Sequence, residues 1–106
     1  MRVLLDECLP RKLKQHLPGC QVSTVPEMGW AGIKNGPLLR LMEPVFDVFV
    51  TIDSNLQSQQ NLSSITLAIV VMAAPDNTLE TLEPLMPQVL AALQRIGPGS
   101  LVRIEP

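Results

Sequence analysis

Short apolar runs recur along the chain and are separated by segments with turn or helical character. Five of these runs predict strands, over residues 2–5, 20–25, 45–53, 65–72 and 100–105. The runs at 45–53 and 65–72 are apolar at nearly every position, so we expect both of their faces to be buried. The last run is amphipathic, which is typical of an edge strand.

Three segments between the strands predict helices, over residues 10–17, 35–42 and 79–96. Asn35 is the expected N-cap of the second helix. Pro84 and Pro87 predict that the third helix is kinked or broken near its start. The Gly and Pro content of 26–36 predicts a loop, and the polar segment 54–64 has room for a helical turn.

Strands that alternate with helices favour a mostly parallel sheet covered by helices on both sides. The 106 residues show no internal repeat and no linker, so they predict one domain over 1–106. The expected fold class is α/β, a three-layer α/β/α arrangement with four to five strands.

The composition is that of a folded globular domain, because 46% of the residues are apolar and only 17% are charged. No stretch approaches the roughly 18 apolar residues of a membrane span. The start of the chain is too short and too acidic for a secretory signal. We therefore expect no membrane partner and a cytoplasmic location.

Neither the net charge nor the cysteines identify a ligand. The net charge of −2 is not that of an electrostatic nucleic-acid binder, although residues 1–40 carry more bases than acids. That excess fits either a basic face or ordinary solvated helix surfaces. Cys8 and Cys20 are too far apart for a CxxC pair, and with His16 they lack a fourth zinc ligand, so we expect small buried hydrophobes.

Acids stand where two predicted strands end. Asp6 and Glu7 close the first strand, and Asp53 closes the third. If these strands are neighbours, the carboxylates converge at one edge of the sheet, where a hard cation such as Mg²⁺ or Mn²⁺ would relieve their repulsion. The alternative is that Asp6 and Glu7 only cap the loop, by pairing with a nearby base: Arg11, Lys12 or Lys34.

Two metal-dependent families carry acids at these strand ends. A receiver domain of two-component signalling would also need a hydroxyl after the fourth strand and a lysine after the fifth. Ala73 and Ala74 stand at the first of these positions, and the last lysine of the chain is Lys34. A receiver-like phosphoacceptor domain is therefore disfavoured.

The second family fits the residues better. The segments "LLDECLP", "WAGIKNGPLLRL" and "VFVTIDSNL" together resemble the small PIN-like proteins of prokaryotes, a branch of the PIN nuclease superfamily often found in toxin–antitoxin-like gene pairs. The resemblance covers roughly the first 60 residues well and the remainder by strand order only. It implies a Mg²⁺- or Mn²⁺-dependent ribonuclease, a hydrolase of RNA phosphodiesters, with an antitoxin protein as a partner.

The resemblance also implies roles for individual residues. Asp6 and Asp53 match the motif acids and would be metal ligands. Glu7 matches the second acid of the opening motif and would be a further ligand only if the strand has already ended, since adjacent strand residues face opposite ways. Thr51 matches a hydroxyl two residues before Asp53, where it would orient that carboxylate or a bound water. The alternative for Thr51 is ordinary strand propensity.

Other polar and aromatic residues flank the expected site. Lys34 and Arg40 would touch phosphates or act as plain surface charges. Asn35 would offer a neutral oxygen. Trp30 would either stack on a base or cover the edge of the core.

The chain also departs from the family pattern, which gives a second hypothesis. Relatives often carry an acid near Asn35 and another just after the third strand, where Ser54 and Asn55 stand here. Fewer negative ligands weaken divalent-cation binding. The alternative is therefore a catalytically inactive PIN-like interaction module, or a homodimer joined by the last helix or by the 100–105 strand.

Overall fold

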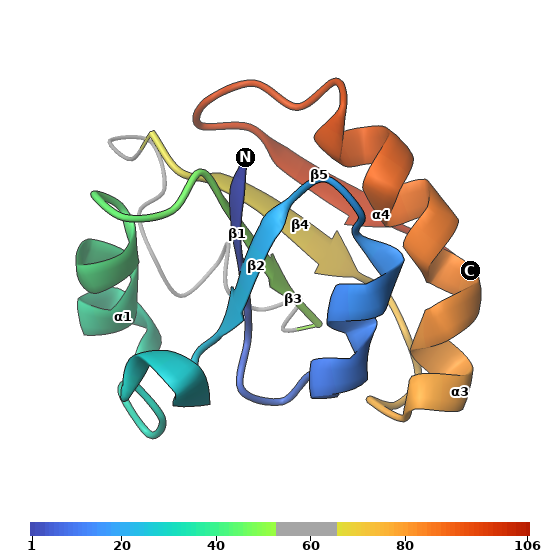
Figure 1. Cartoon of the computed structure of the whole chain (residues 1–106), viewed down its shortest axis with the longest axis horizontal. Coiled ribbons are helices and arrows are strands. Elements are labelled where there is room, and N and C mark those ends of the chain that lie inside the picture. Colours follow the sequence, from blue (N-terminus) through green and yellow to red (C-terminus); the bar gives the residue numbers. More distant parts are fainter. Residues whose placement is uncertain (53–65) are drawn as a thin grey trace.

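The computed structural model describes residues 1–52 and 66–106. Its centre is a five-stranded sheet in the order β2-β1-β3-β4-β5, and every neighbouring pair is parallel. Helices lie on both sides of this sheet (Figure 1). The strands are β1 (Arg2–Leu5), β2 (Gln21–Thr24), β3 (Val48–Thr51), β4 (Ala68–Met72) and β5 (Leu101–Ile104). The five predicted strands and the three-layer α/β class are confirmed.

The central strands are buried on both faces, as their apolar runs predict. All five residues of β4 and all four of β3 are buried. Alternate residues of a strand point to opposite faces. In β3, Val48 and Val50 therefore belong to one core cluster, while Phe49 belongs to the other.

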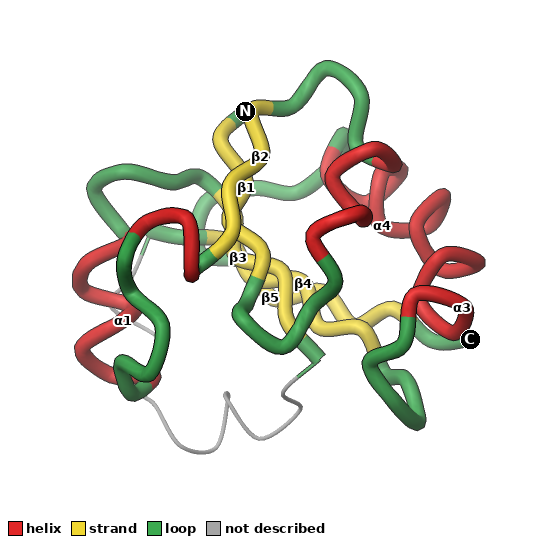
Figure 2. Tube along the Cα trace, turned by 60° about the horizontal axis from the view of Figure 1, so that its bottom comes forward, coloured by secondary structure: helices red, strands yellow, loops and turns green. Residues whose placement is uncertain are grey.

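Each face of the sheet is covered by a different set of helices. One face packs against the 3₁₀ helix η1 (Arg11–His16) and the C-terminal helices, through buried side chains such as Leu13, Leu82 and Val89. The other face packs against α1 (Asn35–Met42) and the loop before it, through Leu38, Leu39 and Met42. The two helical layers lie on opposite sides of the strands in Figure 2.

Proline divides the C-terminal helical segment. The chain forms α3 (Leu79–Leu82), one 3₁₀ turn η3 (Glu83–Leu85) and α4 (Met86–Leu93). Pro84 and Pro87 each stand at the start of a new element, where the missing backbone N–H costs no hydrogen bond. The predicted break is therefore confirmed.

Local details differ from the sequence prediction. The first helix is 3₁₀ throughout, and Pro10 and Pro18 bound its short segment. Asn35 is the first helical residue of α1, and Lys34 occupies the N-cap position without a side-chain cap, so the prediction for the Asn35 cap is wrong. The loop at 26–36 contains a 3₁₀ turn, η2 (Pro26–Met28).

The third strand begins later than its apolar run predicts. The backbone N–H groups of Val45 and Phe46 donate to the Met42 carbonyl at 3.0 and 2.8 Å, so these residues close the end of α1. Phe46 is buried in the core cluster on the α1 side without belonging to the sheet. The far end of the predicted run, Asp53, and the segment 54–64 lie outside the described residues. No helix of the described ranges has the length and apolar character needed to cross a membrane.

Candidate functional site

The candidate site lies at the edge of the sheet where the parallel strands end. We call this edge the carboxyl rim: residues 6–8 after β1, Val25 after β2, Ile52 after β3 and Ala73 after β4. β1 and β3 are neighbours at the centre of the sheet. The connection that leaves β1 leads to β2 on one side, and the connection that leaves β3 leads to β4 on the other. In open parallel sheets, ligands bind outside the carboxyl ends of the strands at such a reversal of strand order.

Two polar side chains meet at this reversal. Asp6 follows β1 directly, and Thr51 is the last residue of β3. The Thr51 hydroxyl donates to Asp6 Oδ2 at 2.6 Å. Thr51 is fully buried, while Asp6 retains 9% exposure. A short bond to a carboxylate with little access to water is a strong one, because the acceptor is charged.

The backbone fixes Asp6 before its side chain is considered. The Asp6 N–H donates to the Val50 carbonyl at 2.9 Å, which extends the β1–β3 ladder by one residue. The Glu7 N–H donates to Asp6 Oδ1 at 2.8 Å. Each oxygen of the carboxylate therefore has a donor, which fixes the orientation of the side chain.

Glu7 has a different role from Asp6. β1 has ended at Leu5, so Glu7 is released from the strand alternation, as a shared site would require. Its exposed carboxylate nevertheless accepts from the Gly32 N–H, with both Oε atoms at 3.2 Å. Gly32 has φ of +83°, a left-handed conformation that favours glycine. Glu7 thus holds the loop before α1 against the rim.

The alternative to a metal site is that these acids pair with nearby bases. Neither Asp6 nor Glu7 forms a salt bridge with Arg11, Lys12 or Lys34 among the residues that the structure describes. Both acids do accept from backbone N–H groups. Glu7 orders the loop before α1 in this way, as that alternative expects.

Cys8 is a member of the site that sequence reasoning missed. Burial is the main cause that raises the pKa of its thiol to about 11, and the negative charge of Asp6 adds to the rise. The Asn77 side chain, from the loop after β4, donates to the Cys8 carbonyl at 2.8 Å. The residue types give no signal of this proximity: it depends on the turn closed by the Leu9 N–H and the Asp6 carbonyl at 3.0 Å, which brings Cys8 back towards Asp6.

The expected substrate-binding residues lie at different distances from the carboxyl rim. Lys34 and Asn35 stand at the start of α1, which begins beside the Gly32 contact to Glu7 and hence at the carboxyl rim. Arg40 follows Lys34 by six residues, about 9 Å further along the helix at 1.5 Å per residue. Lys34 and Asn35 are therefore near the candidate site, whereas Arg40 is displaced from it.

Trp30 covers the edge of the core. Its ring meets that of Phe46 edge to face, with centroids 6.1 Å apart at 81°. Both rings belong to the core cluster on the α1 side of the sheet. This geometry is the core-edge alternative that the sequence left open.

The described donors fit part of a hard-metal site. A carboxylate offers about four lone-pair positions, and the bonds from Thr51 and Glu7 leave Asp6 with acceptor capacity for a cation. Within residues 1–52 and 66–106, no three His, Cys, Asp or Glu side chains are grouped to hold a metal ion. Asp6 thus fits as one oxygen ligand for Mg²⁺ or Mn²⁺. The other expected ligand, Asp53, lies outside the described residues.

Comparisons of the chain with models of protein families, with curated proteins and with solved structures gave no match in any of the three.

Proposed function

We propose that this protein is a Mg²⁺- or Mn²⁺-dependent ribonuclease of PIN-like type, whose metal site is built on Asp6. The observation that carries the proposal is the 2.6 Å bond between Thr51 and Asp6 at the reversal of strand order. It supplies a nearly buried, oriented carboxylate at the place where parallel sheets bind ligands. The motif resemblance supplies the reaction class.

The residues of the carboxyl rim would have different roles in metal binding. Asp6 and Asp53 would hold the ion, and Thr51 would position the Asp6 carboxylate. Glu7 keeps the loop before α1 in place through Gly32. When bound, a divalent ion in such a site activates water for attack on a phosphodiester and stabilises the leaving oxygen.

Cys8 favours an anionic substrate by remaining neutral. Its pKa is raised from 9.0 to about 11, so the thiol stays protonated at neutral and at mildly alkaline pH and adds no negative charge beside Asp6. A thiolate at this position would repel a phosphodiester and would favour softer metals than Mg²⁺ or Mn²⁺.

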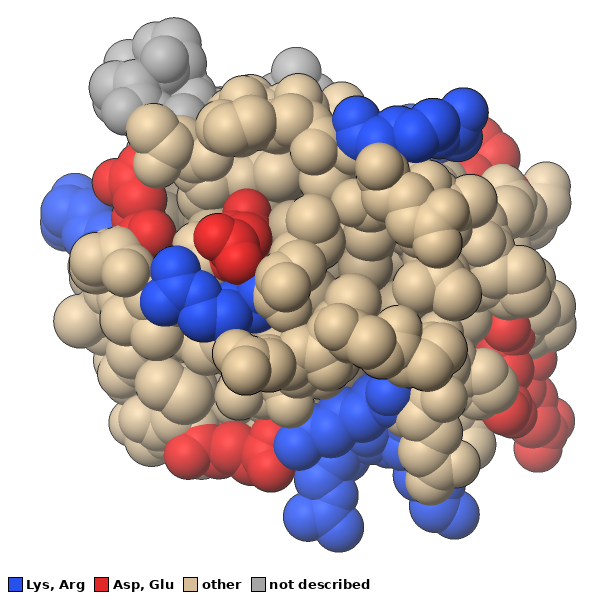
Figure 3. All heavy atoms as spheres, turned by 45° about the horizontal axis from the view of Figure 1, so that its top comes forward, with Lys and Arg blue, Asp and Glu red and all other residues tan. Residues whose placement is uncertain are grey.

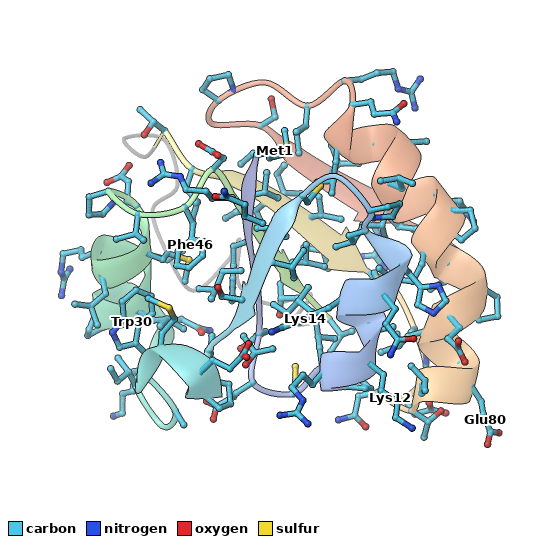
Figure 4. The ribbon with its side chains drawn as sticks, in the orientation of Figure 1. Met1, Lys12, Lys14, Trp30, Phe46 and Glu80 are labelled. Atoms are coloured by element: carbon cyan, nitrogen blue, oxygen red, sulfur yellow. The ribbon has the colours of Figure 1, made fainter. Side chains whose placement is uncertain are left out.

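Metal-dependent cleavage of a mixed-sequence single-stranded RNA tests the proposal. We expect the native protein to cut in Mn²⁺ and to stop when EDTA is added, and the variants Asp6→Asn and Asp53→Asn to be inactive. Each variant removes one ligand charge with little change of shape. Glu80→Gln is the matched control, because Glu80 is exposed on α3, at the outer edge of the molecule (Figure 4), and takes no part in the hydrogen bonds of Asp6, Glu7 or Thr51 described above.

A second candidate function has its own supporting observation. Among the described residues, no three His, Cys, Asp or Glu side chains are grouped to hold a metal ion, and the exposed Glu7 carboxylate contacts the Gly32 N–H. That arrangement favours an inactive PIN-like module that binds a partner protein. If no RNA is cut and the melting temperature ignores Mn²⁺, this second function replaces the first.

A further inference from the structure

The 3₁₀ helix η1 presents its basic residues outward. Side chains three residues apart eclipse one another in a 3₁₀ helix, so its residues form three rows. One row contains Leu13, which is fully buried and anchors the helix in the core. The other two rows are polar and carry Arg11 with Lys14, and Lys12 with Gln15.

Two of these cations are left without a counter-charge. Lys14 pairs with Glu27 at 2.6 Å, and this contact lowers the pKa of the Glu27 carboxyl below its ordinary value. Arg11 and Lys12 are exposed and form no ion pair within the part of the chain that the structure describes. A surface hollow of about 450 Å³ lies against the helix, lined by Arg11, Lys12, Lys14, Gln15 and Glu27.

This basic surface adjoins the carboxyl rim. A turn closed by the Asp6 carbonyl and the Leu9 N–H joins β1 to η1. Arg11 follows Asp6 by five residues, so even an extended chain would separate them by no more than about 18 Å. Lys12 and Lys14 lie towards the end of the molecule at which β1 finishes (Figure 4).

The opposite end of the sheet carries little charge. The face at the amino ends of the strands is largely uncharged, with isolated acidic and basic side chains, and basic side chains gather only towards its lower edge (Figure 3). The net charge of the chain is −2. A polyanion would therefore be attracted to a local surface of this protein rather than to the protein as a whole.

We infer that η1 is a binding surface for the phosphate backbone of single-stranded RNA, with Arg11 and Lys12 each contacting a phosphate. This inference rests on the proposed function, because it names the residues that would lead the substrate to Asp6. Phosphate contacts of this kind position a strand without reading its sequence. Recognition of an anionic membrane typically takes four to eight clustered bases, whereas η1 has three and one is neutralised.

Fluorescence anisotropy of a labelled oligouridylate tests the inference, in EDTA so that no cleavage can occur. The double variant Arg11→Gln, Lys12→Gln is compared with Arg95→Gln, Arg103→Gln, which removes the same formal charge from exposed positions in the C-terminal half. Because Arg103 pairs with Glu105, the single variants Lys12→Gln and Arg95→Gln are compared as well. We expect the first pair to weaken binding about tenfold at low salt. We also expect it to reduce the slope of log K against log salt by about 1.4, at about 0.7 for each phosphate contact.

Several results would overturn the inference. Equal losses in both double variants would mean that only net charge matters. The inference is also wrong if the native protein does not bind the oligouridylate, or if Arg11 and Lys12 matter only for vesicles rich in phosphatidylserine or for an acidic protein. Thermal melting of both variants checks that each is folded.

The failure of this inference and that of the proposed function can be told apart. RNA binding that depends on Arg11 and Lys12, without cleavage in Mn²⁺, would contradict the nuclease and support the binding surface. Cleavage by the Arg11→Gln, Lys12→Gln variant with an unchanged KM would support the nuclease and contradict the binding surface.

Discussion

Thr51 and Asp6 are 45 positions apart in the sequence, and the hydroxyl of one donates to the carboxylate of the other at 2.6 Å. The contact exists because β1 and β3 are parallel neighbours, with Leu5 opposite Val50. It joins the ends of two central strands and orients the acid on which the candidate metal site depends. Its loss should therefore affect both stability and metal binding.

Replacing Thr51 with valine keeps the shape of the side chain and removes the hydroxyl. We expect Thr51→Val to lower the free energy of unfolding by about 1–3 kcal/mol, because a nearly buried carboxylate loses its donor. Thr51→Ser restores the donor and should recover most of that loss. Urea unfolding measures the difference, and equal stabilities for the two variants would show that the bond contributes nothing.

Mn²⁺ should stabilise the native protein through Asp6. At a metal concentration about 100 times Kd, binding to the folded state alone adds about 2.7 kcal/mol to the free energy of unfolding. We expect Asp6→Asn to abolish the resulting shift of the melting temperature and Glu80→Gln to retain it. Thr51→Val should reduce the shift and Thr51→Ser should restore it, which separates a positioning role from general damage to the fold. A native melting temperature that does not respond to Mn²⁺ would refute this prediction.

The thiol of Cys8 should react slowly. With a pKa of about 11, its thiolate fraction at pH 8 is on the order of 100 times smaller than that of an ordinary thiol. In a Cys20→Ser background, alkylation by iodoacetamide should therefore be slow at pH 8. Asp6→Asn removes the neighbouring negative charge, so it should lower the pKa of Cys8 and speed the reaction. A rate unaffected by Asp6→Asn would contradict this electrostatic coupling.

Ionisation of the Cys8 thiol should lower the free energy of unfolding at alkaline pH. The thiol ionises near its ordinary pKa of 9.0 in the unfolded chain but near 11 in the folded protein. Its contribution is present in full below about pH 9 and is lost as the pH rises through 11. Unfolding measured from pH 8 to 11 should show a steeper loss for the native protein than for Cys8→Ser.

Thr78 caps α3, and its loss should destabilise the C-terminal helices. Its side chain accepts from the Thr81 N–H at 3.3 Å, and its hydroxyl also donates to Asp76 at 2.7 Å. Thr78→Ala should cost about 1 kcal/mol, and Thr78→Ser should cost much less. Thermal melting compares the two variants, and equal effects would mean that the cap is unimportant.

Thr78 also makes Asp76 sensitive to acid. The Thr78 hydroxyl is the main cause that lowers the pKa of the Asp76 carboxyl below its ordinary value of 3.8. A lowered pKa stabilises the folded state above pH 3.8, and this contribution disappears as the pH falls through the folded value. Asp76 is fully exposed, so the effect should be small. Acid unfolding should show a reduced effect in Thr78→Ala, which removes the hydroxyl but keeps the backbone N–H of residue 78 and the Thr81 hydroxyl.

The fluorescence of Trp30 should respond to unfolding and not to RNA binding. Its contact with Phe46 places it at the core edge, so Trp30→Ala should cost about 2 kcal/mol, less than a fully buried Trp would. The single tryptophan of the chain also makes emission a direct probe of this position. We expect the emission to change on unfolding in urea and to stay unchanged when oligouridylate is added. Quenching by the oligonucleotide would favour base stacking.

The sequence predicts the fold well because its strongest signals are local. The apolar runs at β3 and β4 identify strands buried on both faces, and Pro84 and Pro87 divide the last helix where proline lacks an N–H. The location of Asp6 at the end of the first strand follows from the same patterns. These features depend on residues that are adjacent or one turn apart.

The partners of the site residues are less predictable, because strand pairing brings them from distant parts of the chain. Spacing along the chain links Thr51 with Asp53, whereas the β1–β3 register gives Thr51 a bond to Asp6. No local pattern in the sequence predicts that the Glu7 carboxylate accepts from the N–H of Gly32, 25 residues away. Cys8 is an ordinary small hydrophobe by composition, and its raised pKa depends on burial and on the turn that returns it to Asp6.

The order of the elements also sets what happens during synthesis. Four of the five strands, β2-β1-β3-β4, are complete at Met72, whereas α3 and α4, which cover one face of the sheet, come afterwards. Until the ribosome has released these helices, Val48, Val50 and Val70 lack most of their cover. A chain cut short after β4 therefore exposes an apolar sheet face and is prone to aggregate, so the last third of this protein protects the strands made before it.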